Sequence, residues 1–171
     1  EQSHVASLPI AGGGGSYATV VSNGSRPLSA VSSVPRPAGV PGEFVSPFGA
    51  FAFTATGLGV GATETFELYL PYNRAIVGAL KRNRLTGVWE NVAVSVTHIG
   101  TVKTKITYAL TDGGPYDADA AANGQIQDPV VPYLQATSIP TLSQWGLLIL
   151  SALMAFSAAV VVRRRGSFAR R

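Results

Sequence analysis

The sequence predicts an all-β, immunoglobulin-like sandwich with an extended N-terminal arm and one C-terminal transmembrane helix. Three features of the 171-residue chain lead to this prediction: short alternating apolar runs in the middle, a Gly-, Pro- and Ser-rich first quarter, and an uncharged apolar stretch near the end. Charged residues make up 13% of the chain. That is about half the usual share in a soluble domain, which indicates that part of the chain is not built for water.

Residues 1–43 are predicted to be an arm or linker. They contain four consecutive glycines at 12–15 and five prolines, with few aromatic side chains. Such a segment has too little apolar area to offset the entropy lost on ordering. A short β-prone piece at 17–21 could still add to an exposed sheet edge.

Residues 44–130 are predicted to form the sandwich. Residues 63–70 show the alternation best, with Phe66, Leu68 and Leu70 on one face. Turn residues separate this run from the others, and strands at such spacing are typical of a β-sandwich. The remaining runs are 50–55, 75–80, 88–96 and 101–110. Residues 131–144 are predicted to be a linker.

The segment 111–129 concentrates acidic and amide side chains on a Gly-rich loop. Hard oxygen ligands of this kind hold calcium, although the spacing departs from that of an EF-hand. The alternative is a loop stabilised by Asx-turns, in which Asp112 and Asn123 bond to nearby backbone N–H groups. Calcium is therefore a candidate ion, and its candidate ligands are Asp112, Asp117, Asp119, Asn123 and Asp128.

Residues 145–162 carry no charge and are followed at once by three arginines. As a helix these 18 residues would reach about 27 Å, enough for a transmembrane helix in contact with membrane lipid, although a buried core helix would be equally apolar. Because positive residues stay in the cytoplasm, residues 163–171 are expected there and the sandwich outside. This predicts a single-pass protein of the bacterial inner membrane. Small residues along the helix would also allow close packing with other integral membrane subunits.

The same tail contains an ordered set of motifs: an Ile-Pro-Thr-Leu box, a Trp-Gly pair, the apolar span and an arginine cluster. This order resembles the IPTL-type C-terminal sorting signal of exported proteins in Gram-negative bacteria. The resemblance implies recognition and processing by an exosortase, a transpeptidase-like membrane enzyme. The residues that carry it are Ile139, Pro140, Thr141, Leu142, Trp145, Gly146, Arg163, Arg164 and Arg165.

Residues 50–130 resemble the choice-of-anchor U domain. The shared features are an Asp-Gly-Gly at 112–114, an acidic cluster at 117–119, an Ala-Asn-Gly at 122–124 and an Asp-Pro at 128–129. The chain departs from that pattern in having one acid fewer in the cluster and two valines after the Asp-Pro. The resemblance implies an exported bacterial protein with an alternative anchor, and no catalytic activity that could be transferred.

Composition and motifs argue against several classes of function. The absence of cysteine excludes disulfides, thiol catalysis and Cys-based metal sites. Five of the 13 basic residues lie in the last nine positions, and the rest of the chain has a net charge of −1, which argues against nucleic-acid binding. Lys81, Arg82 and Arg84 are expected at an exposed hairpin tip. No Ser-His-Asp order or nucleophile elbow is present, so no enzyme activity is predicted.

The sequence thus predicts a non-enzymatic exported envelope protein, with its sandwich in the periplasm or at the surface for protein–protein association. The start at Glu1 is what removal of a signal peptide would leave. In the alternative, the tail is never cut. The chain would then be an accessory single-span subunit that clamps the periplasmic face of a larger membrane complex.

Overall fold

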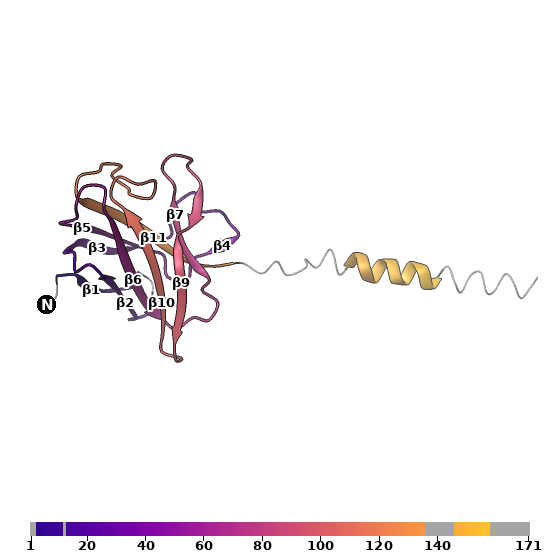
Figure 1. Cartoon of the computed structure of the whole chain (residues 1–171). Helices are drawn as coiled ribbons and strands as arrows, with labels where there is room; N and C mark the ends of the chain where they lie inside the picture. The colour runs from indigo at the N-terminus through magenta and orange to yellow at the C-terminus, as the bar shows by residue number, and fades with distance from the viewer. Residues whose placement is uncertain (1–2, 12, 136–145, 158–171) are drawn as a thin grey trace, which may run out of the picture. The chain divides into compact units, whose positions relative to one another are not determined.

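The computed structural model of the protein describes residues 3–11, 13–135 and 146–157 (Figure 1). The chain divides into two units, Glu1–Ala136 and Thr137–Arg171. The first unit is a sheet-rich, sandwich-like domain, and the described part of the second is a short helix over residues 146–157.

The first sheet has five antiparallel strands in the order β1-β2-β6-β10-β9. Its central strand β6 pairs with β10 over nine residues, from Thr63 opposite Thr111 to Pro71 opposite Lys103. In both strands every second side chain is buried, which is the period expected of a sheet with one face covered. The strands are β1 Val5–Pro9, β2 Tyr17–Ser22, β6 Thr63–Pro71, β9 Ala93–Ile99 and β10 Lys103–Thr111.

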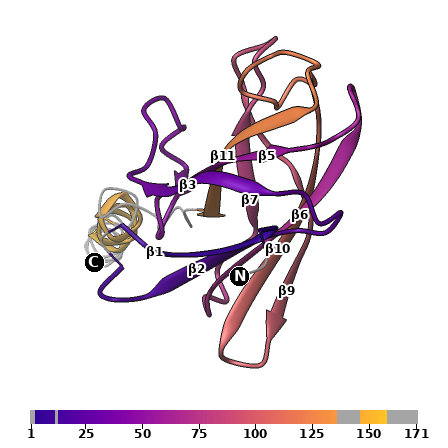
Figure 2. The ribbon, with the colours of Figure 1, turned by 90° about the vertical axis from the view of Figure 1, so that its left-hand side faces the viewer.

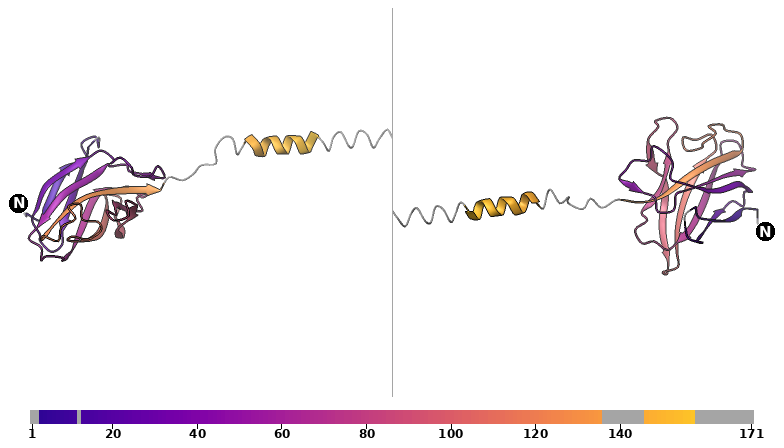
Figure 3. Two further views of the ribbon diagram at one scale, coloured as in Figure 1. Left: turned by 90° about the horizontal axis from the view of Figure 1, so that it is seen from above. Right: turned by 180° about the vertical axis from the view of Figure 1, so that it is seen from behind.

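The second sheet has the order β3-β5-β11-β7-β8, with β4 also paired to β11. Figure 3 shows β11 as the long orange strand of this sheet. Pro129 and Pro132 deprive β11 of two ladder donors, and the strand changes its pairing between them, from β5 up to Val130 to β7 from Val131. The strands are β3 Leu28–Val34, β4 Phe44–Val45, β5 Ala50–Thr56, β7 Gly78–Arg82, β8 Trp89–Asn91 and β11 Gln125–Gln135.

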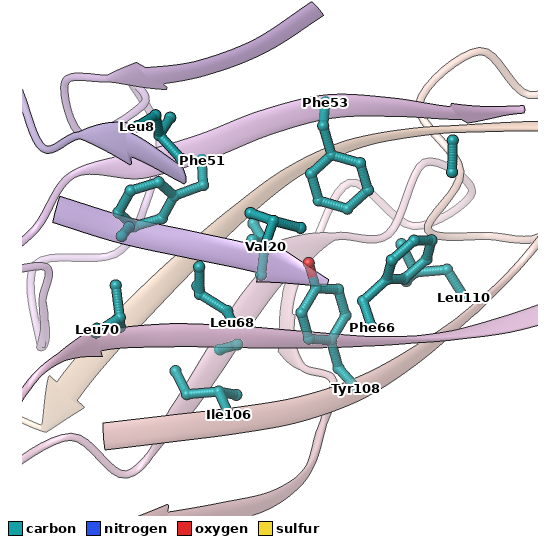
Figure 4. Close-up of a cluster of buried hydrophobic side chains, with 14 of the residues drawn as sticks. Leu8, Val20, Phe51, Phe53, Phe66, Leu68, Leu70, Ile106, Tyr108 and Leu110 are labelled. Atoms are coloured by element: carbon teal, nitrogen blue, oxygen red, sulfur yellow. The ribbon is translucent and has the colours of Figure 1, made fainter. Parts of the chain in front are cut away.

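The core lies between the two sheets (Figure 2). Phe53 of the second sheet and Phe66 of the first meet with ring centroids 5.0 Å apart, and Tyr108 lies beside Phe66 at 5.7 Å. Figure 4 shows how side chains from both sheets interdigitate in this cluster. Its labelled members are Leu8, Val20, Phe51, Phe53, Phe66, Leu68, Leu70, Ile106, Tyr108 and Leu110.

The predicted N-terminal arm is wrong, because residues 1–43 contain β1, β2 and β3. Strand β2 pairs with β6, and its residues Ala18 and Val20 are fully buried. The glycines and prolines of this segment belong mainly to the turns between strands, so an average over its composition hides strands that a neighbouring strand stabilises. The loop before β4 is also ordered, since Arg36 Nη2 donates to the carbonyl oxygens of Val40 and Pro41 at 2.7 and 2.9 Å.

The immunoglobulin-like arrangement and the 131–144 linker are corrected as well. An immunoglobulin constant domain has seven strands, whereas the described part of this chain has eleven in sheets of five and six strands. Residues 131–135 continue β11 instead of starting a linker. The additional strands come mostly from the N-terminal residues that composition alone assigned to an arm.

The transmembrane helix predicted over residues 145–162 is likewise corrected. The one helix in the described part of the chain covers 146–157, and no described helix is long and apolar enough to cross a bilayer. Residue 145 and residues 158–162 lie outside the described residues.

The placement of β2 in the core can be tested with a matched pair of substitutions. Val20 is fully buried between the sheets, whereas its neighbour Val21 is only partly buried. We expect Val20→Ala to lower the free energy of unfolding by about 2 kcal/mol through lost burial and a small cavity. Val21→Ala should change it by about 0.5 kcal/mol or less. Equal effects in urea denaturation would contradict the assignment of β2 to the core.

Candidate functional site

Three buried polar side chains meet inside the sandwich. Lys81 of β7 donates a hydrogen bond from Nζ to Oδ1 of Asp128 on β11, and Tyr108 of β10 donates from its hydroxyl to Oδ2 of Asp128 at 2.7 Å. Lys81 and Asp128 are each 1% exposed, and Tyr108 is fully buried. Because Tyr108 belongs to the first sheet and the other two residues to the second, this Lys81–Asp128–Tyr108 network links the sheets.

Strand periodicity places each member of the network in the core. Side chains two positions apart on a strand point to the same face. Lys81 therefore follows the core residue Ala79, and Asp128 lies between two core residues of β11. Tyr108 is likewise flanked by core residues of β10. The flanking core residues are Ile126 and Val130 on β11 and Ile106 and Leu110 on β10.

Burial raises the pKa of both oxygen acids in the network, Asp128 and Tyr108. Burial raises the pKa of Asp128, and this outweighs the lowering by the charge of Lys81 and by the hydrogen bonds from Lys81 and Tyr108. The nearby carboxylate of Asp117 raises the same pKa further. Burial first, and the charge of Asp128 second, raise the pKa of Tyr108 well above its ordinary value, so that its hydroxyl stays a donor.

A cavity of about 440 Å³ adjoins this network. Lys81 and Asp117 line it together with Arg82, Arg84, Trp89 and Tyr116. Pro37 also lines the cavity, so the N-terminal segment predicted to be an arm contributes to its wall. Lys81 thus lies between the polar network in the core and this cavity.

Asp112 organises the acidic loop through its backbone contacts. Its Oδ2 accepts hydrogen bonds from the backbone N–H groups of Gly61 and Gly124 at 2.8 and 2.9 Å, and its Oδ1 accepts one from Asn123 at 3.1 Å. Burial raises the pKa of Asp112, but these bonds, with one from Gln125, together outweigh burial and leave the pKa below its ordinary value. The side chain of Asp112 thus joins the start of the loop to its end at residues 123–124 and to the turn before β6.

The other predicted calcium ligands are divided between the loop and the core. Asp117 is fully buried and accepts backbone N–H groups from Gly113 at 2.8 Å and Gln127 at 2.9 Å. Asp128 lies beside Lys81 in the core. The two carboxylates are therefore already bonded to groups of the protein.

Asp119 and Asn123 do lie together, at the surface of the loop. Asn123 Nδ2 donates to Asp119 Oδ2 at 3.2 Å. Each residue also closes an Asx-turn, Asp119 with the backbone N–H of Ala121 and Asn123 with that of Gln125. Within the described residues no three His, Asp or Glu side chains are grouped so that they could hold a metal ion. The geometry favours the Asx-turn alternative, and calcium binding stays a prediction.

The structure describes only one residue of the predicted sorting motif. Gly146 is the first residue of the helix over 146–157. The other eight lie outside the described residues: Ile139, Pro140, Thr141, Leu142, Trp145, Arg163, Arg164 and Arg165.

Sequence reasoning missed the role of Lys81. The residue was expected at an exposed hairpin tip with Arg82 and Arg84, and only these two arginines are exposed. A weak signal was present, because Lys81 follows Ala79 at the strand period. The carboxylate that compensates its charge lies 47 residues away, so only the pairing of β7 with β11 reveals the partner.

Comparison with known proteins identifies the tail. Residues 137–166 match the family model of the IPTL-CTERM motif. No curated protein and no solved structure matches the chain. The resemblance to the choice-of-anchor U domain therefore stays a hypothesis. The protein carries an IPTL-CTERM sorting signal, which marks an exported protein that is secreted or associated with the cell envelope.

The hydrogen bonds of Asp112 predict that its carboxylate contributes more to the stability of the domain than the carboxylate of Asp119 does. Asp112→Ala leaves three backbone N–H groups without their acceptor. Asp119→Ala removes only exposed hydrogen bonds, the Asx-turn to Ala121 and the bond from the side chain of Asn123. We expect Asp112→Ala to lower Tm by several degrees and Asp119→Ala to lower it only slightly. Thermal unfolding followed by circular dichroism measures both changes. Similar losses of Tm would contradict the stabilising role of Asp112.

The lowered pKa of Asp112 also predicts a pH dependence. A carboxyl whose pKa is lower in the folded state stabilises the fold above its unfolded pKa, near about pH 4, and loses this contribution as pH falls through the folded value. We expect the stability of the wild type to fall more steeply below about pH 4 than that of Asp112→Asn, which cannot titrate. Urea midpoints measured across this range test the difference, and parallel curves would speak against it.

Proposed function

We propose that this protein delivers a non-enzymatic β-sandwich to the bacterial cell surface, where the domain associates with other proteins. Its IPTL-CTERM tail is the recognition element for an exosortase-like enzyme, which processes the tail during delivery. The proposal combines the matched motif at residues 137–166 with the position of the folded domain in the chain.

The order of domain and signal along the chain supports processing. The last strand, β11, ends at Gln135, and the motif match begins at residue 137. A cut within the motif would therefore leave all eleven strands that the structure describes in the product. This is the single observation on which the proposal depends most.

The position of β11 in the second sheet explains why a cut must fall after residue 135 if the domain is to stay folded. β11 pairs with β5, β7 and β4, and its side chains Ile126 and Val130 lie in the core. A cut even a few residues earlier would remove pairing from the middle of the second sheet. Processing can be separated from folding only because the signal starts after this strand ends.

An exposed apolar edge supports association. Strand β9 is one of the two edge strands of the first sheet, so one of its sides has no partner strand in that sheet. Three apolar side chains are exposed on this strand and its following turn, namely Val94 (74%), Ile99 (47%) and Val102 (69%). Exposed apolar side chains beside an open edge are typical of a surface for strand or side-chain pairing with another protein.

The processing step can be tested by mass spectrometry of the protein recovered from its native host. We expect the wild-type protein to end within the motif and the double variant Pro140→Ala, Thr141→Ala to keep Arg171, because the box no longer fits the enzyme. Ser167→Ala, outside the matched residues, serves as the control and should be processed normally. A wild-type protein that retains Arg171 would contradict processing and favour a permanently retained tail.

A further inference from the structure

We propose that Lys81 and Asp128 are joined by an intramolecular isopeptide bond between Nζ and Cγ, which the folded sandwich forms with the loss of one water molecule. The bond would fasten β7 to β11 inside the core. This inference is independent of the sorting of the protein, because it rests on the Lys81–Asp128–Tyr108 network alone.

Folding brings the two reacting groups into direct contact. Lys81 Nζ donates to Asp128 Oδ1, and both side chains are 98–100% buried. The pairing of β7 with β11, with Leu80 opposite Val131, holds the two backbones in register beside them. An amine and a carboxyl held together in this way react with an effective molarity that can reach about 10⁵–10⁸ M.

The step is a condensation without any change of oxidation state. One proton moves from the Lys81 ammonium to the Asp128 carboxylate along their hydrogen bond, which produces a neutral amine and a carboxylic acid. The lone pair of Nζ attacks Cγ, and the bond between Cγ and Oδ1 breaks. Oδ1 leaves as water with the acid proton and one proton from Nζ, and Oδ2 becomes the oxygen of the new amide. No oxidant, reductant or co-reactant is needed.

Tyr108 is placed to assist this step. Its hydroxyl donates to Oδ2 at 2.7 Å, and Oδ2 is the oxygen that gains negative charge when the amine attacks Cγ. A fixed donor in a dry site stabilises such an oxyanion. Asp117, held by the backbone N–H groups of Gly113 and Gln127, contributes a nearby negative charge that raises the pKa of Asp128 and so favours the proton transfer from Lys81 to its carboxylate.

The surroundings also favour the product over the ion pair. A buried ion pair pays a large desolvation cost, whereas an amide carries no net charge. The amide oxygen would keep the hydrogen bond from Tyr108, and the carbonyl oxygen of Pro129, 3.4 Å from Lys81 Nζ, would accept from the amide N–H. The released water can leave through the cavity of about 440 Å³ that Lys81 lines.

The cross-link would have a clear structural use. The chain has no cysteine and so no disulfide to hold its sheets together. A bond between Lys81 and Asp128 would close a loop of 47 residues that contains β8, β9 and β10. By analogy with other covalent loop closures, it should raise Tm by roughly 10 °C relative to a chain without it.

Intact mass of the purified full chain tests the proposal. We expect the wild type to be lighter than its sequence mass by one water molecule, and Lys81→Arg and Asp128→Ala each to have their full sequence mass. Fragmentation after trypsin should yield one branched peptide that joins the segments around Lys81 and Asp128. Tyr108→Phe, which keeps the ring and removes only the donor, should show a smaller cross-linked fraction at early times after refolding.

Two results would overturn the proposal. The first is a folded wild type, judged by circular dichroism, that has its full sequence mass. The second is a loss of water that persists in Asp128→Ala or yields no branched peptide, since cyclisation at Asp112-Gly113 also releases water. If either core variant fails to fold, the wild-type mass and its branched peptide decide the question without it.

Discussion

The fold depends on the position of β11 in the middle of the second sheet. Backbone polar groups buried between sheets must be paired, and β11 meets this requirement by bonding to β5 along its first half and to β7 and β4 along its second. The same strand carries Ile126 and Val130 into the core. Because β11 is the last strand of the sandwich, the domain is complete only when its C-terminal residues are in place.

The core that β11 helps to close is unusual in containing charge. Lys81 and Asp128 lie among apolar side chains, where an unpaired charge would be strongly destabilising. The hydrogen bond between them and the hydroxyl of Tyr108 compensate each group, and the network fixes one relative placement of the two sheets. Asp117 connects these polar features. It lines the cavity and also accepts a hydrogen bond from Gly113 in the loop that Asp112 stabilises.

The relation between sandwich and tail follows from the same arrangement. The last strand in the described part of the domain, β11, ends at Gln135, and the IPTL-CTERM match begins at residue 137. A sorting signal that begins beyond the last strand can be recognised and processed without disturbing any pairing in the sheets. The strands of the domain and the sorting signal therefore occupy separate parts of the chain.

Local pattern in the sequence predicted strands close to β5, β6 and β10, and it predicted the sorting tail. The alternation of Phe66, Leu68 and Leu70 is a period-two signal that does not depend on a distant partner, and the IPTL box is a contiguous motif. Only the tertiary structure decided the rest. The pairing of β2 with β6 and the burial of Lys81 beside Asp128 cannot be predicted from the local sequence pattern. For the strand and the lysine the physical reason is long range, because a Gly-rich segment becomes a strand, and a lysine a core residue, only when a partner dozens of residues away supplies hydrogen bonds and charge.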